Sequence, residues 1–132
     1  MAAYNKFTPA VENMQEGMQA QTDSWAIKLG TAVNQAAGTF TEVANGNGYT
    51  TGGNAVTVTS SAASAGTYKL VLASPSVWTA SGAGFSFQYA VLVDTTAGVN
   101  VAYWDYGSSQ AVAVGETVTV TLDGTNGVYQ VT

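Results

Sequence analysis

The chain has 132 residues and a mass of 13.5 kDa, enough for one domain with a buried core and no crosslinks. It contains no cysteine and no histidine, which excludes a disulfide framework, thiol chemistry, the commonest general base and the usual transition-metal ligands. Only 8% of the residues are charged, against about 25% in ordinary soluble domains, and the net charge is −5.

The basic residues are too few and too scattered to bind phosphate backbones or anionic lipid. They are Lys6, Lys28 and Lys69. We therefore expect no nucleic-acid partner and no membrane partner. A surface of Thr, Ser, Asn, Gln, Gly and Ala suits burial against neighbouring subunits, although a secreted Ser- and Thr-rich β domain would carry nearly the same surface.

Residues 1–23 predict an N-terminal arm with a short helix. The opening MAAYNKFTPAVENMQEGMQ has no continuous apolar run, so we expect neither a signal peptide nor a membrane span. Thr8 is a good helix N-cap, and Pro9 suits the first helical position. The apolar residues that follow at helical spacing are Val11, Met14 and Met18. Because so short a helix is marginal alone, we expect it to form only when docked on its own sandwich or on a neighbour.

From Ser24 onward the apolar residues alternate with a period of two, which predicts strands. The predicted strands are SWAIKLG, AVTVTS, GTYKLVLA, GFSFQYAVLVD, VNVAYWDY, ETVTVTL and GVYQVT. Gly and Asn turns separate them, and no helix long enough for a parallel crossover intervenes. Residues 24–132 therefore predict an all-β domain, an antiparallel β-sandwich of Greek-key or jelly-roll type. A closed barrel is the alternative.

In two of the predicted strands, the alternation of apolar residues predicts which side chains share a face. In GFSFQYAVLVD one face carries Phe85, Phe87, Tyr89, Val91 and Val93, and the other carries Ala90 and Leu92. In VNVAYWDY, the residues Val99, Val101 and Tyr103 lie opposite Ala102, Trp104 and Tyr106. Apolar residues on both faces indicate strands in the middle of a sheet.

Two glycine-rich segments predict turns. NGNGYTTGGN at 45–54 leads into a strand and has no lysine nearby, so it lacks the context of a phosphate-binding loop, and we expect Tyr49 to fold onto the sandwich. DGTNG at 123–127 has oxygen donors but not the alternating pattern or closing glutamate of a calcium loop. We interpret it as a hairpin turn between ETVTVTL and VYQVT.

The candidate catalytic groups are three acids in or beside strong strands, namely Asp94, Asp105 and Glu116. Two carboxyls can form a glycosidase pair. Asp94 stands where a strand-ending residue before a turn is expected, and Asp105 where a strand-end residue bonding to backbone is expected. We therefore predict a protein that is not an enzyme, with no cofactor and no metal site. A carbohydrate-binding module stays open as an alternative, because Trp25, Trp78 and Trp104 could supply a stacking platform as well as fill the core.

Several stretches, taken in order, resemble a family of small virion proteins of tailed bacteriophages. YNKF and SWAIKLG resemble its N-terminal module, and TEVANGNGYTTGGNAVTV resembles its glycine-rich segment before a strand. FQYAVLVDTTAG, VAYWDYGSSQAV and GETVTVTLDGTNGVYQV resemble its C-terminal half. The resemblance covers most of the chain, but residues 31–41 match no motif of the family.

The resemblance implies a capsid decoration (cement) protein, made in the bacterial host and carried on the capsid exterior of the virion. Its partners would be the major capsid protein and further copies of itself in a homotrimer. A tail or head–tail component is the alternative within the family. From the arm we predict a capsid or subunit interface formed by Tyr4, Phe7, Val11, Met14 and Met18, in which the methionines adapt to an irregular partner.

Overall fold

The computed structural model of the chain describes residues 2–10 and 20–132. Its strands are β1 (Ala3–Lys6), β2 (Trp25–Asn34), β3 (Thr39–Glu42), β4 (Asn54–Val56), β5 (Val58–Ser64), β6 (Thr67–Leu72), β7 (Trp78–Thr79), β8 (Phe85–Asp94), β9 (Val99–Val112), β10 (Thr117–Val118) and β11 (Tyr129–Val131). All strand pairs within these residues are antiparallel. The predicted all-β, sandwich-like fold is confirmed.

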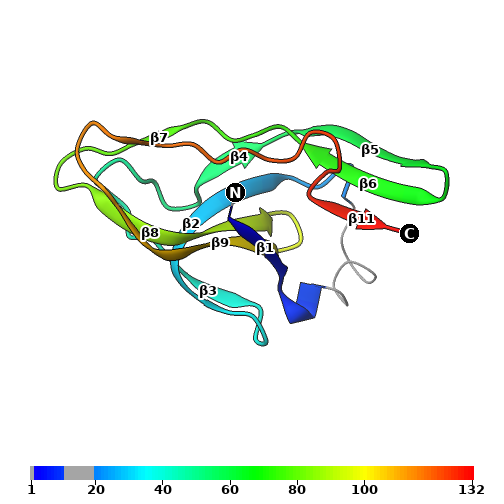
Figure 1. Cartoon of the computed structure of the whole chain (residues 1–132), viewed down its shortest axis with the longest axis horizontal. Coiled ribbons are helices and arrows are strands. Elements are labelled where there is room, and N and C mark those ends of the chain that lie inside the picture. Colours follow the sequence, from blue (N-terminus) through cyan, green and yellow to red (C-terminus); the bar gives the residue numbers. More distant parts are fainter. Residues whose placement is uncertain (1, 11–19) are drawn as a thin grey trace.

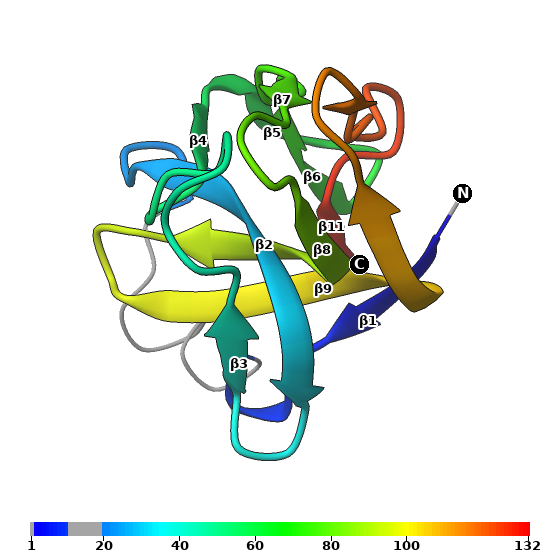
Figure 2. The same cartoon turned by 90° about the vertical axis from the view of Figure 1, so that its left-hand side faces the viewer.

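The strands form two layers (Figure 1). One layer is a six-stranded sheet in the order β1-β9-β8-β2-β3, with β4 paired to β2. The other layer holds the β11-β6-β5 sheet and the short β10-β7 pair, and a view turned by 90° shows them above β8 and β9 (Figure 2). The main core lies between the layers and includes Trp25, Ile27 and Leu29, which share one face of β2 as the sequence predicts.

The prediction of which β8 side chains share a face is wrong, because the strand exchanges its two faces at a register shift. Phe87 lies in the main core together with Ala90 and Leu92, whereas Val91 belongs to a second apolar cluster on the other side of the sheet. The pairing of β8 with β9 shifts between Phe87 and Tyr89. Such an irregularity exchanges the two faces of a strand beyond it, because side chains alternate with a period of two.

The pairing of β8 with β9 contains two irregularities in which β9 has extra residues. Gln88 of β8 stands opposite a longer stretch of β9 that runs from Asp105 to Gln110, and β9 turns a corner there (Figure 2). A second shift leaves Val101 and Ala102 both in the main core, so the prediction that they face opposite ways is wrong.

The carboxylate of Asp105 holds the corner of β9. Its Oδ1 accepts hydrogen bonds from the Gly107 amide (2.8 Å) and from Gln88 Nε2 (3.1 Å). Gly107 has φ of 84°, a left-handed conformation that glycine adopts without strain. The expectation that Asp105 bonds to backbone is confirmed, but the expected strand-end position is wrong, because β9 continues through the corner to Val112.

Residues 3–10 belong to the sandwich. β1 pairs with β9 in register from Ala3 opposite Asp105 to Lys6 opposite Ala102. Phe7 is fully buried in the second cluster, with its ring 5.1 Å from that of Tyr103. Residues 8–10 are helical, as Thr8 and Pro9 predict. Of the two docking alternatives for the arm, residues 3–10 adopt the first, because they pack on the chain's own sandwich.

The C-terminal strands differ from the expected hairpin. Val118, Val120 and Leu122 are buried as their alternation predicts, but only Thr117 and Val118 form a strand. β10 pairs with β7, whereas β11 pairs with β6. The DGTNG segment is therefore a turn between two different sheets, and its interpretation as a hairpin turn is wrong.

The burial of Phe7 predicts a large cost for its truncation. Phe7→Ala should lower the free energy of unfolding by about 3–5 kcal/mol, because it leaves a cavity between the first strand and the sheet. Val114→Ala is the control, since Val114 is 66% exposed, and it should change stability by less than about 0.5 kcal/mol. Urea denaturation of the full chain measures both, and equal stabilities would show that Phe7 is not docked.

Candidate functional site

The five predicted interface residues do not share one environment in the structure. Phe7 is buried inside the domain and cannot contact a partner in this conformation. Tyr4 is 40% exposed, and its ring packs edge-on against Trp104 with 5.5 Å between centroids. Partial burial raises the pKa of Tyr4 to about 12, so its hydroxyl stays neutral at physiological pH. Val11, Met14 and Met18 lie outside the described residues, and their predicted role stays a prediction.

Strand β5 gives the molecule an open edge without charge. It is the outer strand of the β11-β6-β5 sheet and reads VTSSAAS. Figure 1 shows the β5–β6 hairpin extending from one end of the molecule. Residues 43–68, which contain this strand, include no charged residue. Natural proteins usually protect a solvent-exposed edge with Lys, Pro or an inward-pointing charge, and β5 has none of these.

Two other edge strands of the described sheets carry charge, and the remaining ones, β4, β7, β10 and β11, are uncharged but only two or three residues long. β1 ends with Lys6, and β3 ends with Glu42, whose carboxylate lies 3.8 Å from the ammonium of Lys28. The only irregularity in β5 is a register shift between Val58 and Ser60, at its start. Sequence reasoning listed the charges but did not identify this edge, because strand order cannot be read from alternation alone.

The NGNGYTTGGN segment is a turn whose Tyr49 side chain packs into the sandwich, as predicted. Tyr49 is 1% exposed and donates its hydroxyl proton to Glu42 Oε1 (2.7 Å), which also accepts from the Gly52 amide (2.6 Å). A Cβ at Gly53, where φ is 67°, would collide with the carbonyl of Ile27. The glycine serves close backbone packing against β2.

The three candidate acids do not form a glycosidase pair. Asp105 pairs with Tyr89, five positions along β8 from Asp94, so the two lie about 16 Å apart along the strand. Glu116 is exposed beyond the far end of β9, where its Oε1 accepts from the Ala113 amide (3.1 Å). Glycosidase carboxyls are separated by about 5–9.5 Å.

Asp94 is the unusual acid, because it is fully buried. Its Oδ1 accepts from the Ala97 amide (2.9 Å), which fixes the turn after β8 as the sequence predicts. Its Oδ2 is buried without a hydrogen-bond partner among the described residues. The carboxyl of Asp23 forms a hydrogen bond with the Asp94 carboxyl when the two share one proton. Burial first, and Asp23 second, raise the pKa of Asp94 to about 6.

This carboxyl pair predicts a pH dependence of stability. Since the folded-state pKa of Asp94 lies above its unfolded value of about 3.9, the native state binds the extra proton between about pH 4 and pH 6. The free energy of unfolding should therefore fall as the pH rises through that window. Asp94→Asn keeps the acceptor for Ala97 and removes the titration, so it should abolish the decline and gain on the order of 1–2 kcal/mol at pH 7.

Denaturant unfolding of wild type and Asp94→Asn from pH 4 to pH 7 measures the effect. Asp123 does not interfere, because hydrogen bonds from Asn126 and Thr125 lower its pKa and move its contribution below about pH 4. Parallel stability profiles for the two proteins across the window would contradict the assignment.

In the DGTNG segment, the carboxylate of Asp123 accepts hydrogen bonds from residues of the same turn. Asp123 Oδ1 accepts from the amides of Thr125 and Asn126 (both 2.8 Å), and Oδ2 accepts from Asn126 Nδ2 (3.1 Å). Within residues 2–10 and 20–132, no three acidic side chains gather where a metal ion would need them. In the same residues no helix is long and apolar enough to cross a membrane.

Comparison with known proteins identifies no relative. No protein family, no curated protein and no solved structure matches the chain.

Proposed function

We propose that this chain is a structural protein of a tailed-bacteriophage virion, a decoration protein that binds across joints between capsid subunits and stabilises the shell. The observation that carries the proposal is the uncharged open edge of β5 in a chain where only 8% of the residues are charged. An edge of this kind favours pairing with another chain. The motifs from YNKF to GETVTVTLDGTNGVYQV support the particular class of partner.

The hairpin geometry gives the edge a definite set of donors and acceptors. Ala65 and Gly66 both have positive φ, 51° and 81°, and form a two-residue turn that closes on Ser64 and Thr67. Ser64 and Thr67 are then a hydrogen-bonded pair. In the alternation of an antiparallel ladder, the backbone groups of Ala63 and Ser61 point away from β6. These groups would pair with an extended strand of a capsid subunit or of a second copy.

Assembly on a capsid would multiply a modest contact. A single short edge supplies few hydrogen bonds, each contributing about 0.5–1.5 kcal/mol net. In a homotrimer, or on a repeating shell, each further contact forms at high effective concentration, so the whole binds more tightly than any one edge. Few charges on the surface keep the desolvation cost of such contacts low.

The edge can be tested by adding one charge. Ala62 lies opposite Lys69, so Ala62→Glu places a carboxylate on the edge and gains a favourable cross-strand pair. We expect the variant to keep wild-type stability and to lose at least about tenfold in binding to expanded shells of the parent phage, because the carboxylate must be desolvated in the joint. Co-sedimentation of the purified protein with the shells measures the binding.

Ser109→Glu is the matched control, since it adds the same charge at an exposed position on β9 and should bind as the wild type does. Wild-type binding by Ala62→Glu would reject the edge as the contact. Failure of the wild type to bind shells would reject the function itself, and rings or stacked discs in negative stain would point to the tail.

A further inference from the structure

The aromatic residues of the chain divide into core and surface. Trp25 is 2% exposed and Trp78 is 3% exposed, and both belong to the main core. Trp104 only packs against the edge of that core, as does Tyr106 two positions further along β9. Residues two apart on a strand point to the same side, so the two rings form one surface.

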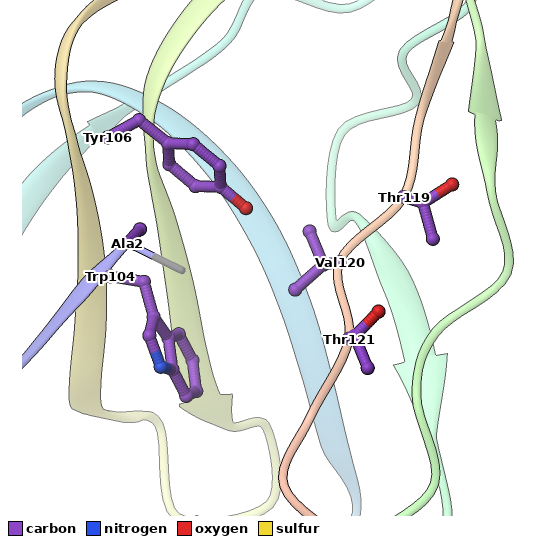
Figure 3. Close-up of a pocket in the computed structure, with 6 residues that line it drawn as sticks. All are labelled: Ala2, Trp104, Tyr106, Thr119, Val120 and Thr121. Carbon is purple, nitrogen blue, oxygen red and sulfur yellow. The ribbon is translucent and has the colours of Figure 1, made fainter.

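This surface is one wall of a groove of about 290 Å³. The opposite wall is the segment that follows β10, and the groove is lined by Ala2, Trp104, Tyr106, Thr119, Val120 and Thr121. Figure 3 shows Val120 pointing toward the two rings and the Tyr106 hydroxyl turned toward Val120. Ala2 lies beside the rings on the β1 side.

Neighbouring rings hold both aromatic side chains in place. Tyr4 packs edge-on against Trp104 with an interplanar angle of 67°. Phe87 packs edge-on against Tyr106, with centroids 5.2 Å apart and an angle of 75°. A ligand that stacks on Trp104 and Tyr106 would therefore meet rings that are already oriented, which reduces the entropy lost on binding.

The groove also has polar groups with no partner inside the protein. Within the described residues, the Tyr106 hydroxyl makes no hydrogen bond, and it is turned toward the second wall (Figure 3). The indole nitrogen of Trp104 also makes no hydrogen bond, but it lies on the side of its ring away from that wall. Burial raises the pKa of Tyr106, so its hydroxyl remains a neutral donor and acceptor. Residues 119–121 belong to no strand, and their amides and carbonyls make no backbone hydrogen bond among the described residues.

We propose that the groove between Trp104, Tyr106 and residues 119–121 binds a neutral pyranose unit of a glycan. The C–H face of a pyranose packs on an aromatic ring, and its hydroxyls bond to the phenol of Tyr106 and to backbone groups of residues 119–121. No lysine lines the groove, which gives no attraction for an acidic sugar. Its volume lies at the lower end of the range for ligand pockets, about 300–1,000 Å³, which suits one or two sugar units.

A proline-rich peptide is the rival occupant, because such peptides also dock on aromatic grooves. It needs a longer groove, since a polyproline segment advances about 3.1 Å per residue and is recognised over several residues. The compact groove favours the sugar. Sugar binding in this groove is a property of the isolated chain, separate from the proposed virion function, and it does not require a capsid.

The test uses the full chain labelled with ¹⁵N and titrated with maltohexaose, cellohexaose, mannohexaose and a proline-rich decapeptide, each to millimolar concentration. The chain has three tryptophans, and the buried indoles are shielded from ligand. We expect at least one sugar to bind and to shift the indole N–H resonance of Trp104 alone. No shift with any of the sugars, a shift confined to other residues, or binding of the peptide in their place would overturn the proposal.

Three variants locate the site. Trp104→Ala should weaken sugar binding at least tenfold, and Tyr106→Phe, which removes only the hydroxyl, should weaken it severalfold. Ala2→Trp fills the groove from the β1 side without removing a core contact, so it tests the site even if Trp104→Ala does not fold. Val114→Ala is the exposed control and should bind as the wild type does. Unchanged affinity in Ala2→Trp and Tyr106→Phe would overturn the proposal.

Discussion

Strand β9 is the element on which the rest of the structure depends. It pairs with β1 on one side and with β8 on the other, and its two register shifts decide which side chains reach each core. At the corner held by Asp105, the strand changes direction and continues along the start of β8. Before the corner it contributes Tyr103 to the second cluster and Trp104 to the opposite face. Core, N-terminal docking and aromatic groove therefore share one strand.

The longer strands β2, β6, β8 and β9 and one face of β2 were predictable from sequence, because period-two alternation survives wherever pairing is regular. The short strands β1, β3 and β7 were not predicted. Trp25, Ile27 and Leu29 illustrate this, as does the burial of Tyr49 in a segment with the glycines of a turn. Phe87 illustrates the limit. Its alternation with Tyr89 is unbroken in the sequence, and the register shift that separates their faces depends on the length of the facing strand.

Features that need two distant segments were not predictable. The DGTNG turn looks like a hairpin because the apolar residues on both sides alternate, but pairing partners are chosen by the sandwich as a whole. Likewise, nothing near Asp94 in sequence predicts its complete burial beside Asp23. The groove joins Trp104 to residues 119–121 through the fold, and sequence reasoning could offer only a list of tryptophans.

The scarcity of charge connects the fold to the proposed function. A monomer with an uncharged β5 edge is exposed to unwanted pairing, whereas a subunit that is covered in an assembly is not. A cryo-electron microscopy reconstruction of the parent virion tests this account most directly. We expect density for this chain on the outside of the shell at joints between capsid subunits, with the β5 edge against a neighbouring chain. Density for the chain in the tail, or its absence from the particle, would contradict the account.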